Sequence, residues 1–217
     1  MNLKARWDAL HSTKAPHSVS WYRPHLETSL AFIEHTHAGP SASIIDVGAG
    51  QSTLAYDLLA RGYRNLTILD ISAKALEKAK KQLGEDADRI RFIAEDVTLA
   101  ELPRHACDIW HERATFHFLT SEVQRSAYIR QAIQSLKPAG HLIVAAFAPT
   151  GPARCSGLDV VCYSAESLAR ELDEHFRLVE STEVLHRTPT GAVRPFVYTR
   201  FEGLAFKASE HTPAHSK

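Results

Sequence analysis

Short apolar runs alternate with segments of helical periodicity along most of the chain. Residues 43–47, rich in β-branched side chains, predict a buried strand, and leucines at helical spacing in 52–61 predict a helix that stops at Gly62. The same alternation continues downstream. Further strands are predicted at 65–70, 89–96, 106–112 and 141–147, and further helices at 73–83, 120–136 and 164–173.

Strands separated by helices indicate parallel pairing with right-handed crossovers. The end of the chain departs from that pattern, because the extended runs 176–187 and 193–201 are joined by "TPTGA", a hairpin signal. The sequence therefore predicts an α/β fold, a doubly wound sheet that is mostly parallel and carries an antiparallel C-terminal hairpin.

Three regions are expected along the chain. Residues 1–40, with Trp7, Trp21, Tyr22 and Leu26 as apolar points, predict an N-terminal helical cap that either packs on the sheet or covers a ligand. Residues 41–206 form the main domain, and the polar residues 207–217 are expected to be a flexible tail.

Composition narrows the class of protein. Of 217 residues, 44% are hydrophobic and 23% are charged, as in a globular protein, and 25 basic residues balance 25 acidic ones. Nothing in this balance favours nucleic acid or a membrane as a partner. Three cysteines without CxxC spacing predict neither a disulfide framework nor a metal site. We expect a cytoplasmic monomer or homodimer that acts on a small molecule.

The most informative stretch is "IIDVGAGQST", residues 44–53, where a strand runs into two glycines. Gly48 and Gly50 allow close approach of a ligand to the backbone, and ligands of open α/β sheets bind beyond the carboxyl ends of the strands. Asp46 precedes the glycines, and Asp70 and Asp96 end the next two strands. Asp70 can accept both hydroxyls of a ribose, and Asp96 can accept an exocyclic amine. Three acids at three successive strand ends predict a nucleoside site.

A nicotinamide dinucleotide fits this pattern less well. Its fingerprint needs a third glycine for helix packing, and this chain has Thr53 there. An acid before the glycines suits a ligand with a cationic end better than a pyrophosphate. The pattern favours an adenosyl group that carries an amino acid.

The segments "IIDVGAGQS", "LTILDIS", "IAEDV" and "LKPAGHLIV" resemble the successive motifs of class I S-adenosylmethionine-dependent methyltransferases over residues 43–147. The resemblance implies a Rossmann-like seven-stranded sheet of order 3-2-1-4-5-7-6 and S-adenosyl-L-methionine as the cofactor. It also implies, by matching position, a set of cofactor-binding residues. These are Asp46, Gly48, Gly50, Gln51, Asp70, Ile71, Asp96 and Val97, with Trp21 of the N-terminal cap beside them.

The methyl acceptor is expected beside "WHERATFHFL", residues 110–119, which follows the fourth strand. The segment brings several ionisable groups into one predicted bend. We expect Arg113 to stabilise negative charge and His111 or His117 to accept a proton, with Glu112 and Phe116 lining the substrate pocket. The alternative is a purely structural role for this segment, as the end of a strand that runs into a core helix.

"DIWHERATFHFL" also resembles, more briefly, a segment of thiopurine and related thiol methyltransferases. A thiol acceptor is chemically reasonable, because a pKa near 8.5 leaves a few per cent thiolate at neutral pH. The long connection 151–164 is a second candidate, with Arg154 and Cys155 as substrate residues or, alternatively, as parts of an ordered surface loop.

Two other functions stay open. The opening residues also resemble the start of some small protein-lysine N-methyltransferases, although Arg113 is an unfavourable neighbour for an ammonium group. A non-enzymatic S-adenosylmethionine-binding sensor or partner subunit is the second alternative, since nothing in the sequence disrupts the predicted cofactor site.

Overall fold

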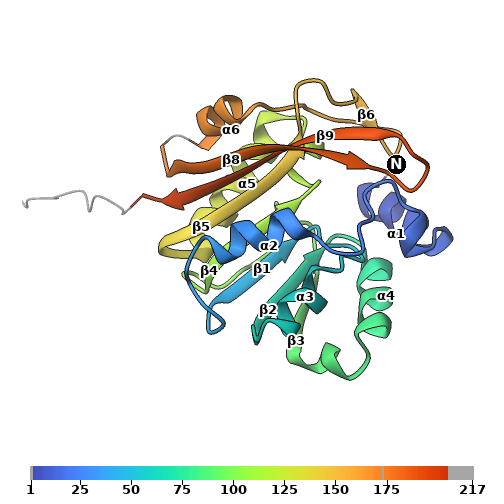
Figure 1. Ribbon diagram of the computed structural model, residues 1–217, viewed down its shortest axis with the longest axis horizontal. Coiled ribbons are helices and arrows are strands. Elements are labelled where there is room, and N and C mark those ends of the chain that lie inside the picture. Colours follow the sequence, from blue (N-terminus) through green and yellow to red (C-terminus); the bar gives the residue numbers. More distant parts are fainter. Residues whose placement is uncertain (1, 173, 205–217) are drawn as a thin grey trace, which may run out of the picture.

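A computed structural model describes residues 2–172 and 174–204, so the predicted tail at 207–217 lies outside the described residues. The described chain forms a central sheet with helices on both faces (Figure 1). No helix of the described residues has the length and apolar character needed to cross a membrane.

The sheet has seven strands in the order β3-β2-β1-β4-β5-β9-β8. Their bounds are β1 Ser43–Val47, β2 Asn65–Asp70, β3 Ile90–Ala94, β4 Cys107–Arg113, β5 Leu136–Phe147, β8 Phe176–Arg187 and β9 Val193–Gly203. The first five strands pair in parallel, and β9 is antiparallel to both of its neighbours. The seven-stranded, Rossmann-like fold with its antiparallel C-terminal hairpin is thus confirmed.

The helices between the strands follow their local signals. Helix α4 (Ala73–Leu83) begins at Ser72, whose hydroxyl accepts a hydrogen bond from the Ala75 amide at 3.1 Å, and it ends at Gly84 in the left-handed region. The other helices of the sheet layers are α2 Glu27–Glu34, α3 Leu54–Ala60, α5 Glu122–Ser135 and α6 Ala165–Leu172.

Strand β5 begins earlier than predicted. It follows α5 directly at Leu136. Pro138 and Gly140, which stand between the predicted helix and the predicted strand, lie inside its irregular first half, where the pairing register with β4 shifts between Cys107 and Ile109. The turn residues therefore mark a strand irregularity here and not a break in the strand.

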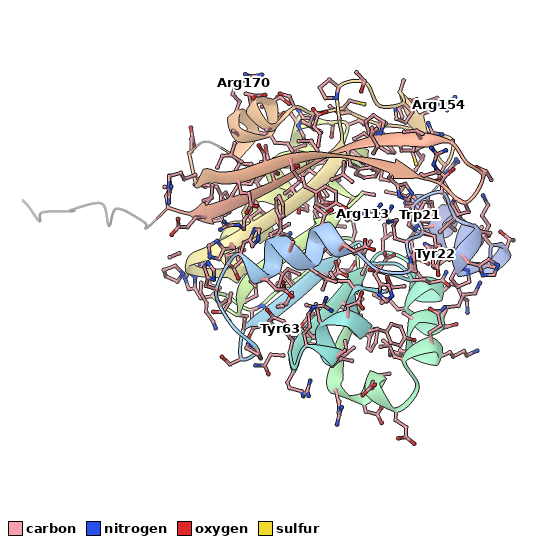
Figure 2. The ribbon with its side chains drawn as sticks, viewed as in Figure 1. Trp21, Tyr22, Tyr63, Arg113, Arg154 and Arg170 are labelled. Atoms are coloured by element: carbon pink, nitrogen blue, oxygen red, sulfur yellow. The ribbon has the colours of Figure 1, made fainter. Side chains whose placement is uncertain are left out.

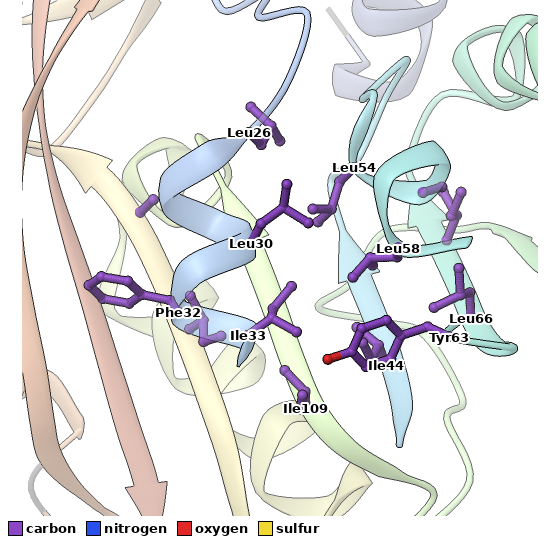
Figure 3. Close-up of a cluster of buried hydrophobic side chains, with 14 of the residues drawn as sticks. Leu26, Leu30, Phe32, Ile33, Ile44, Leu54, Leu58, Tyr63, Leu66 and Ile109 are labelled. Carbon is purple, nitrogen blue, oxygen red and sulfur yellow. The ribbon is translucent and has the colours of Figure 1, made fainter. Parts of the chain in front are cut away.

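Alternation along the strands divides the core into two layers. On one face, Ile44 of β1 and Ile109 of β4 pack against α2 and α3, in the cluster drawn in Figure 3. On the other face, Ile45 and Trp110 pack with residues of α5 and α6. The central strands β1 and β4 bury both sides, as the middle of a doubly wound sheet requires.

Residues 1–40 contain two differently placed parts. Helix α2 belongs to the sheet layer, whereas α1 (Leu3–Thr13) lies beside α4 at the carboxyl ends of the strands (Figure 1). The Asp8 carboxylate accepts hydrogen bonds from the Ser72 hydroxyl at 2.7 Å and the Lys74 amide at 3.2 Å, and the Lys78 ammonium donates to the His11 carbonyl. Polar contacts with the first turns of α4 thus hold α1 in place.

We expect Tyr128→Phe to lower the free energy of unfolding by about 1–3 kcal/mol. The Trp110 indole N–H donates to the Tyr128 hydroxyl at 2.8 Å, and both side chains are fully buried, so the variant leaves a buried donor without a partner. Urea unfolding would measure the change, with the partly exposed Tyr56→Phe as control. Equal stability of the two variants would contradict this assignment.

Candidate functional site

A cavity of about 120 Å³ lies at the carboxyl ends of the central strands, beneath α1. It is the position that ligands of open α/β sheets take. Five aromatic side chains contribute to its wall: Trp7, Trp21, Phe118, Phe147 and Phe196. Predicted site residues that line it are Gly48, Gly50, Asp70, Ile71, Asp96, Val97, Trp21, Arg113 and Cys155.

The loop after β1 presents bare backbone to this cavity. Gly48 and Gly50 have φ values of +63° and +56°, a region that disfavours side chains. A Cβ on Gly48 would lie 1.9 Å from the Thr115 hydroxyl oxygen, so even alanine cannot fit without moving the next loop. Both glycines are therefore required by conformation, and Gly48 is also required by packing.

Asp70, at the tip of β2, joins two backbone segments. One carboxylate oxygen accepts the Gly50 amide at 2.7 Å, and the other accepts the Ser72 amide at 2.7 Å. Burial raises the pKa of Asp70 to about 6, although the two amide hydrogen bonds oppose the increase. Its side chain is thus fixed at the cavity wall and ionised at neutral pH.

Asp96 follows β3 and is also held locally. One of its oxygens accepts hydrogen bonds from the Thr98 amide at 2.9 Å and the Thr98 hydroxyl at 2.7 Å. The next residue, Val97, is buried and shares the cavity wall with Ile71. A carboxylate and two apolar side chains therefore meet at the β2 and β3 end of the cavity.

Asp46, Gln51 and His111 lie behind the glycine loop, in a smaller hollow next to the cavity. The buried His111 ring has both nitrogens engaged, one at 2.7 Å from the Asp46 carboxylate and the other at 2.9 Å from the Ser29 hydroxyl. The structure corrects the predicted placement of His111, because strand alternation turns its ring toward α2 and no nitrogen is left for a substrate.

Glu112 and Phe116 are also placed differently from the prediction. Glu112 is fully buried, and one of its oxygens accepts the amides of Thr115 at 2.7 Å and Phe116 at 3.1 Å, which shapes the bend after β4. Burial raises its pKa to about 8. Phe116 packs against Tyr128 in the core. Neither residue lines the cavity.

His117 belongs to the core as well. Its ring stacks on Phe147 with centroids 4.3 Å apart, and its Nδ1 accepts the Phe147 amide at 3.3 Å. Complete burial lowers the pKa of His117 to about 3, so the ring is neutral. The predicted proton acceptor is therefore a packing residue without access to the cavity.

The connection after β5 places its two predicted substrate residues, Arg154 and Cys155, in different surroundings. It contains a small two-stranded sheet, β6 (Arg154–Cys155) and β7 (Leu158–Asp159). Arg154 is exposed, pairs with Asp159 at 3.0 Å and does not line the cavity, whereas Cys155 does. The surface ion pair corrects the predicted substrate role of Arg154.

Arg113 is fixed from three sides at the β9 end of the cavity. Its Nε donates to the Tyr198 hydroxyl at 2.9 Å, its Nη1 donates to the Trp21 carbonyl at 2.9 Å, and its guanidinium lies 4.9 Å from the centre of the Phe196 ring. Figure 2 shows Arg113 beside Trp21, below the C-terminal hairpin in this view. The N-terminal segment and the hairpin together therefore orient this cation.

Among the cavity residues, sequence reasoning misses His11 of α1 and His186 of β8. It gives Arg194, which faces His186 across the hairpin, only a weak claim. The alternation Arg194, Phe196, Tyr198 on β9 was the available signal, since these three side chains share one face of a strand.

Comparisons with known proteins agree with this geometry. A family model described as a methyltransferase domain matches residues 44–140. Residues 44–140 are therefore similar to a methyltransferase domain, and the sheet order is the one expected of class I S-adenosylmethionine-dependent methyltransferases. The cavity residues contributed by α1, Trp21 and the C-terminal hairpin lie outside this methyltransferase domain match, which explains why family motifs did not reveal most of them.

Relatives of the methyltransferase domain are distant. The Mus musculus eEF1A lysine and N-terminal methyltransferase is 22% identical over 137 residues, which cover 63% of this chain and 19% of that protein, so the match spans about a fifth of the relative's length.

Two solved structures share the fold. The Burkholderia thailandensis 1,6-didemethyltoxoflavin-N1-methyltransferase, bound to 1,6-didemethyltoxoflavin and S-adenosylhomocysteine, has a TM-score of 0.66 and 22% identity, covering 82% of this chain and 77% of that one. A structure concerned with conversion of a disulfide bond into a thioacetal group during echinomycin biosynthesis has a TM-score of 0.75 and 18% identity, covering 96% and 95%.

The buried Glu112 predicts a specific pH dependence of stability. Its pKa is about 8 in the folded protein and near 4.5 when unfolded, so the folded state binds the proton more tightly. The stability that this proton contributes is present below pH 4.5 and is lost as the pH rises through 8. We expect the wild type to lose stability relative to Glu112→Gln over this range in denaturant unfolding. A pH-independent difference between the two proteins would contradict the assignment.

Proposed function

We propose that this chain transfers a methyl group from S-adenosyl-L-methionine to a small nucleophile, most favourably a thiol or another soft acceptor. The observation that carries this proposal is the composition of the cavity. Its one end has the carboxylates and bare backbone that suit the cofactor, and its other end is closed by aromatic and cationic side chains.

The residues at the first three strand tips fit the cofactor. Gly48 and Gly50 would lie under its methionine part, where a Cβ would obstruct, and Asp70 would hold the ribose hydroxyls. Ile71 and Val97 would flank the adenine, with Asp96 accepting its amine. Asp46 and Gln51 would act from behind the loop, by holding His111 and His11 in place.

The opposite end of the cavity favours a small acceptor. Trp7 and Trp21 pack edge to face with centroids 6.0 Å apart, and Trp7 packs on Phe118 at 5.2 Å, so α1 closes this side with interlocked rings. Such an aromatic wall suits a compact acceptor. Arg113 is the charged group held at this end.

When bound, S-adenosyl-L-methionine supplies a methyl group on an already activated, positively charged sulfur. The chain's own task is then to align the acceptor and to favour a free lone pair on it. The Arg113 guanidinium beside an entering thiol lowers the thiol's pKa and increases the thiolate fraction. A buried imidazole base is unnecessary for such an acceptor, which agrees with the placement of His111 and His117 outside the cavity.

We expect Asp70→Asn to weaken binding of S-adenosylhomocysteine about 10- to 100-fold, because a charged hydrogen-bond acceptor is worth about 1.5–3 kcal/mol. Wild-type affinity should also fall as the pH drops below about 6, where Asp70 takes up a proton. Isothermal titration calorimetry measures both effects, with the surface variant Asp159→Asn as control. An unchanged Kd for Asp70→Asn would remove the cofactor assignment.

The acceptor class is tested with radiolabelled S-adenosyl-L-methionine and a panel containing sulfide, 2-mercaptoethanol, thiophenol and a lysine-rich peptide. We expect label in methanethiol from sulfide and in the thioethers formed from the two thiols, and none in the peptide. Sulfide and both thiols staying unlabelled would contradict the soft-acceptor assignment.

Protein-lysine methylation is the second candidate, favoured by the eEF1A lysine and N-terminal methyltransferase relatives. A lysine ammonium would have to lose its proton beside Arg113, which is an unfavourable position for it. Labelled protein bands in a lysate would support this candidate. Tight cofactor binding without transfer to any acceptor would instead support a sensor or partner subunit.

A further inference from the structure

Two arginines in the cavity wall have no carboxylate partner. In the part of the chain that the structure describes, ion pairs within 4.0 Å join carboxylates to Arg23, Arg61, Arg89, Arg125, Arg154, Arg177 and Arg200. No such pair involves Arg113 or Arg194, although both are only partly exposed and both line the cavity. A partly buried cation without a counter-ion is costly, so its position calls for an explanation.

The two guanidinium groups keep hydrogen-bond donors that no described residue uses. Arg113 donates from Nε to Tyr198 and from Nη1 to Trp21, which leaves Nη2 without a hydrogen-bond partner among the described residues. The Arg194 guanidinium makes no hydrogen bond to them at all. Arg194, Phe196 and Tyr198 share one face of β9, so Arg194 extends along the same wall that holds Arg113 through Phe196 and Tyr198.

Nothing else at this end neutralises the two arginines. The cavity's carboxylates, Asp70 and Asp96, belong to the tips of β2 and β3. The neighbouring His186 gives its Nε2–H to the Ser20 carbonyl at 2.7 Å, so it supplies no negative charge. The field at the β9 end of the cavity is therefore positive, and it favours an anion.

We propose that Arg113 and Arg194 together bind a carboxylate-type group of the methyl acceptor, which makes the acceptor a small anionic molecule that carries its nucleophile as a separate group. The planar guanidinium fork suits such a group because it offers paired, charge-assisted hydrogen bonds. The inference rests on the proposed function in placing the acceptor in this cavity, and it adds the chemical class of that acceptor.

The test compares two thiols that differ by one carboxylate, thiophenol and 4-mercaptobenzoate. We expect the wild type to prefer 4-mercaptobenzoate about 10- to 100-fold in kcat/KM, as charged hydrogen bonds predict. Arg194→Gln should abolish the preference, and Arg194→Lys should keep part of it. Arg154→Gln, which changes an arginine of the neighbouring exposed loop, is the matched control and should leave the preference intact.

A binding measurement separates this inference from the proposed function. With S-adenosylhomocysteine present, calorimetry should show that 4-(methylthio)benzoate binds the wild type, whereas thioanisole binds at least tenfold more weakly and Arg194→Gln removes the difference. Such binding without methylation of any thiol would support the anion site and contradict the thiol acceptor. Thermal unfolding confirms that each variant is folded.

Two outcomes would overturn the inference. Equal kcat/KM values for the two thiols, with both slowed in Arg194→Gln, would mean that the arginines bind the thiolate itself. Equal affinity of the wild type for 4-(methylthio)benzoate and thioanisole would mean that the cavity does not recognise a carboxylate.

Discussion

The two hydrogen bonds accepted by Asp70 are the constraint on which this site depends. They tie the loop after β1 to the start of α4, so the glycine backbone, the tip of β2 and the first turn of that helix keep one relative position. The same turn receives Asp8 from α1 through Ser72 and Lys74. One buried carboxylate thus organises the floor of the cavity and the anchor of its roof, which is why a charge is retained there despite the cost of burial.

The sequence predicts the β/α framework well because its signals are local. Ser72 and Gly84 delimit α4. The glycines of the loop after β1 predict a backbone with positive φ from the residue type alone, without knowledge of tertiary contacts. The site residues at the strand tips, including Asp70 and Asp96, follow from the same logic, since parallel strands bring their carboxyl ends to one edge. What can be predicted is therefore what the topology of the sheet alone determines.

The residues at the acceptor end of the cavity cannot be predicted in this way. The segment 110–119 looks like one cluster of ionisable groups, but β4 continues to Arg113, and alternation sends His111 toward α2 and Glu112 into the opposite layer. Only Arg113 reaches the cavity from this cluster, and its partners Trp21, Phe196 and Tyr198 come from both ends of the chain. Contacts between residues so distant in sequence leave no local pattern to interpret.

The docked position of α1 has a consequence for the cavity wall. Trp7 and His11 belong to that wall, and α1 is held both by ring packing of Trp7 on Trp21 and Phe118 and by partly buried polar contacts through Asp8 and Lys78 to α4. The part of the wall that Trp7 and His11 contribute is therefore complete only while α1 stays docked, so the shape of the cavity depends on contacts made at its rim as well as on the sheet.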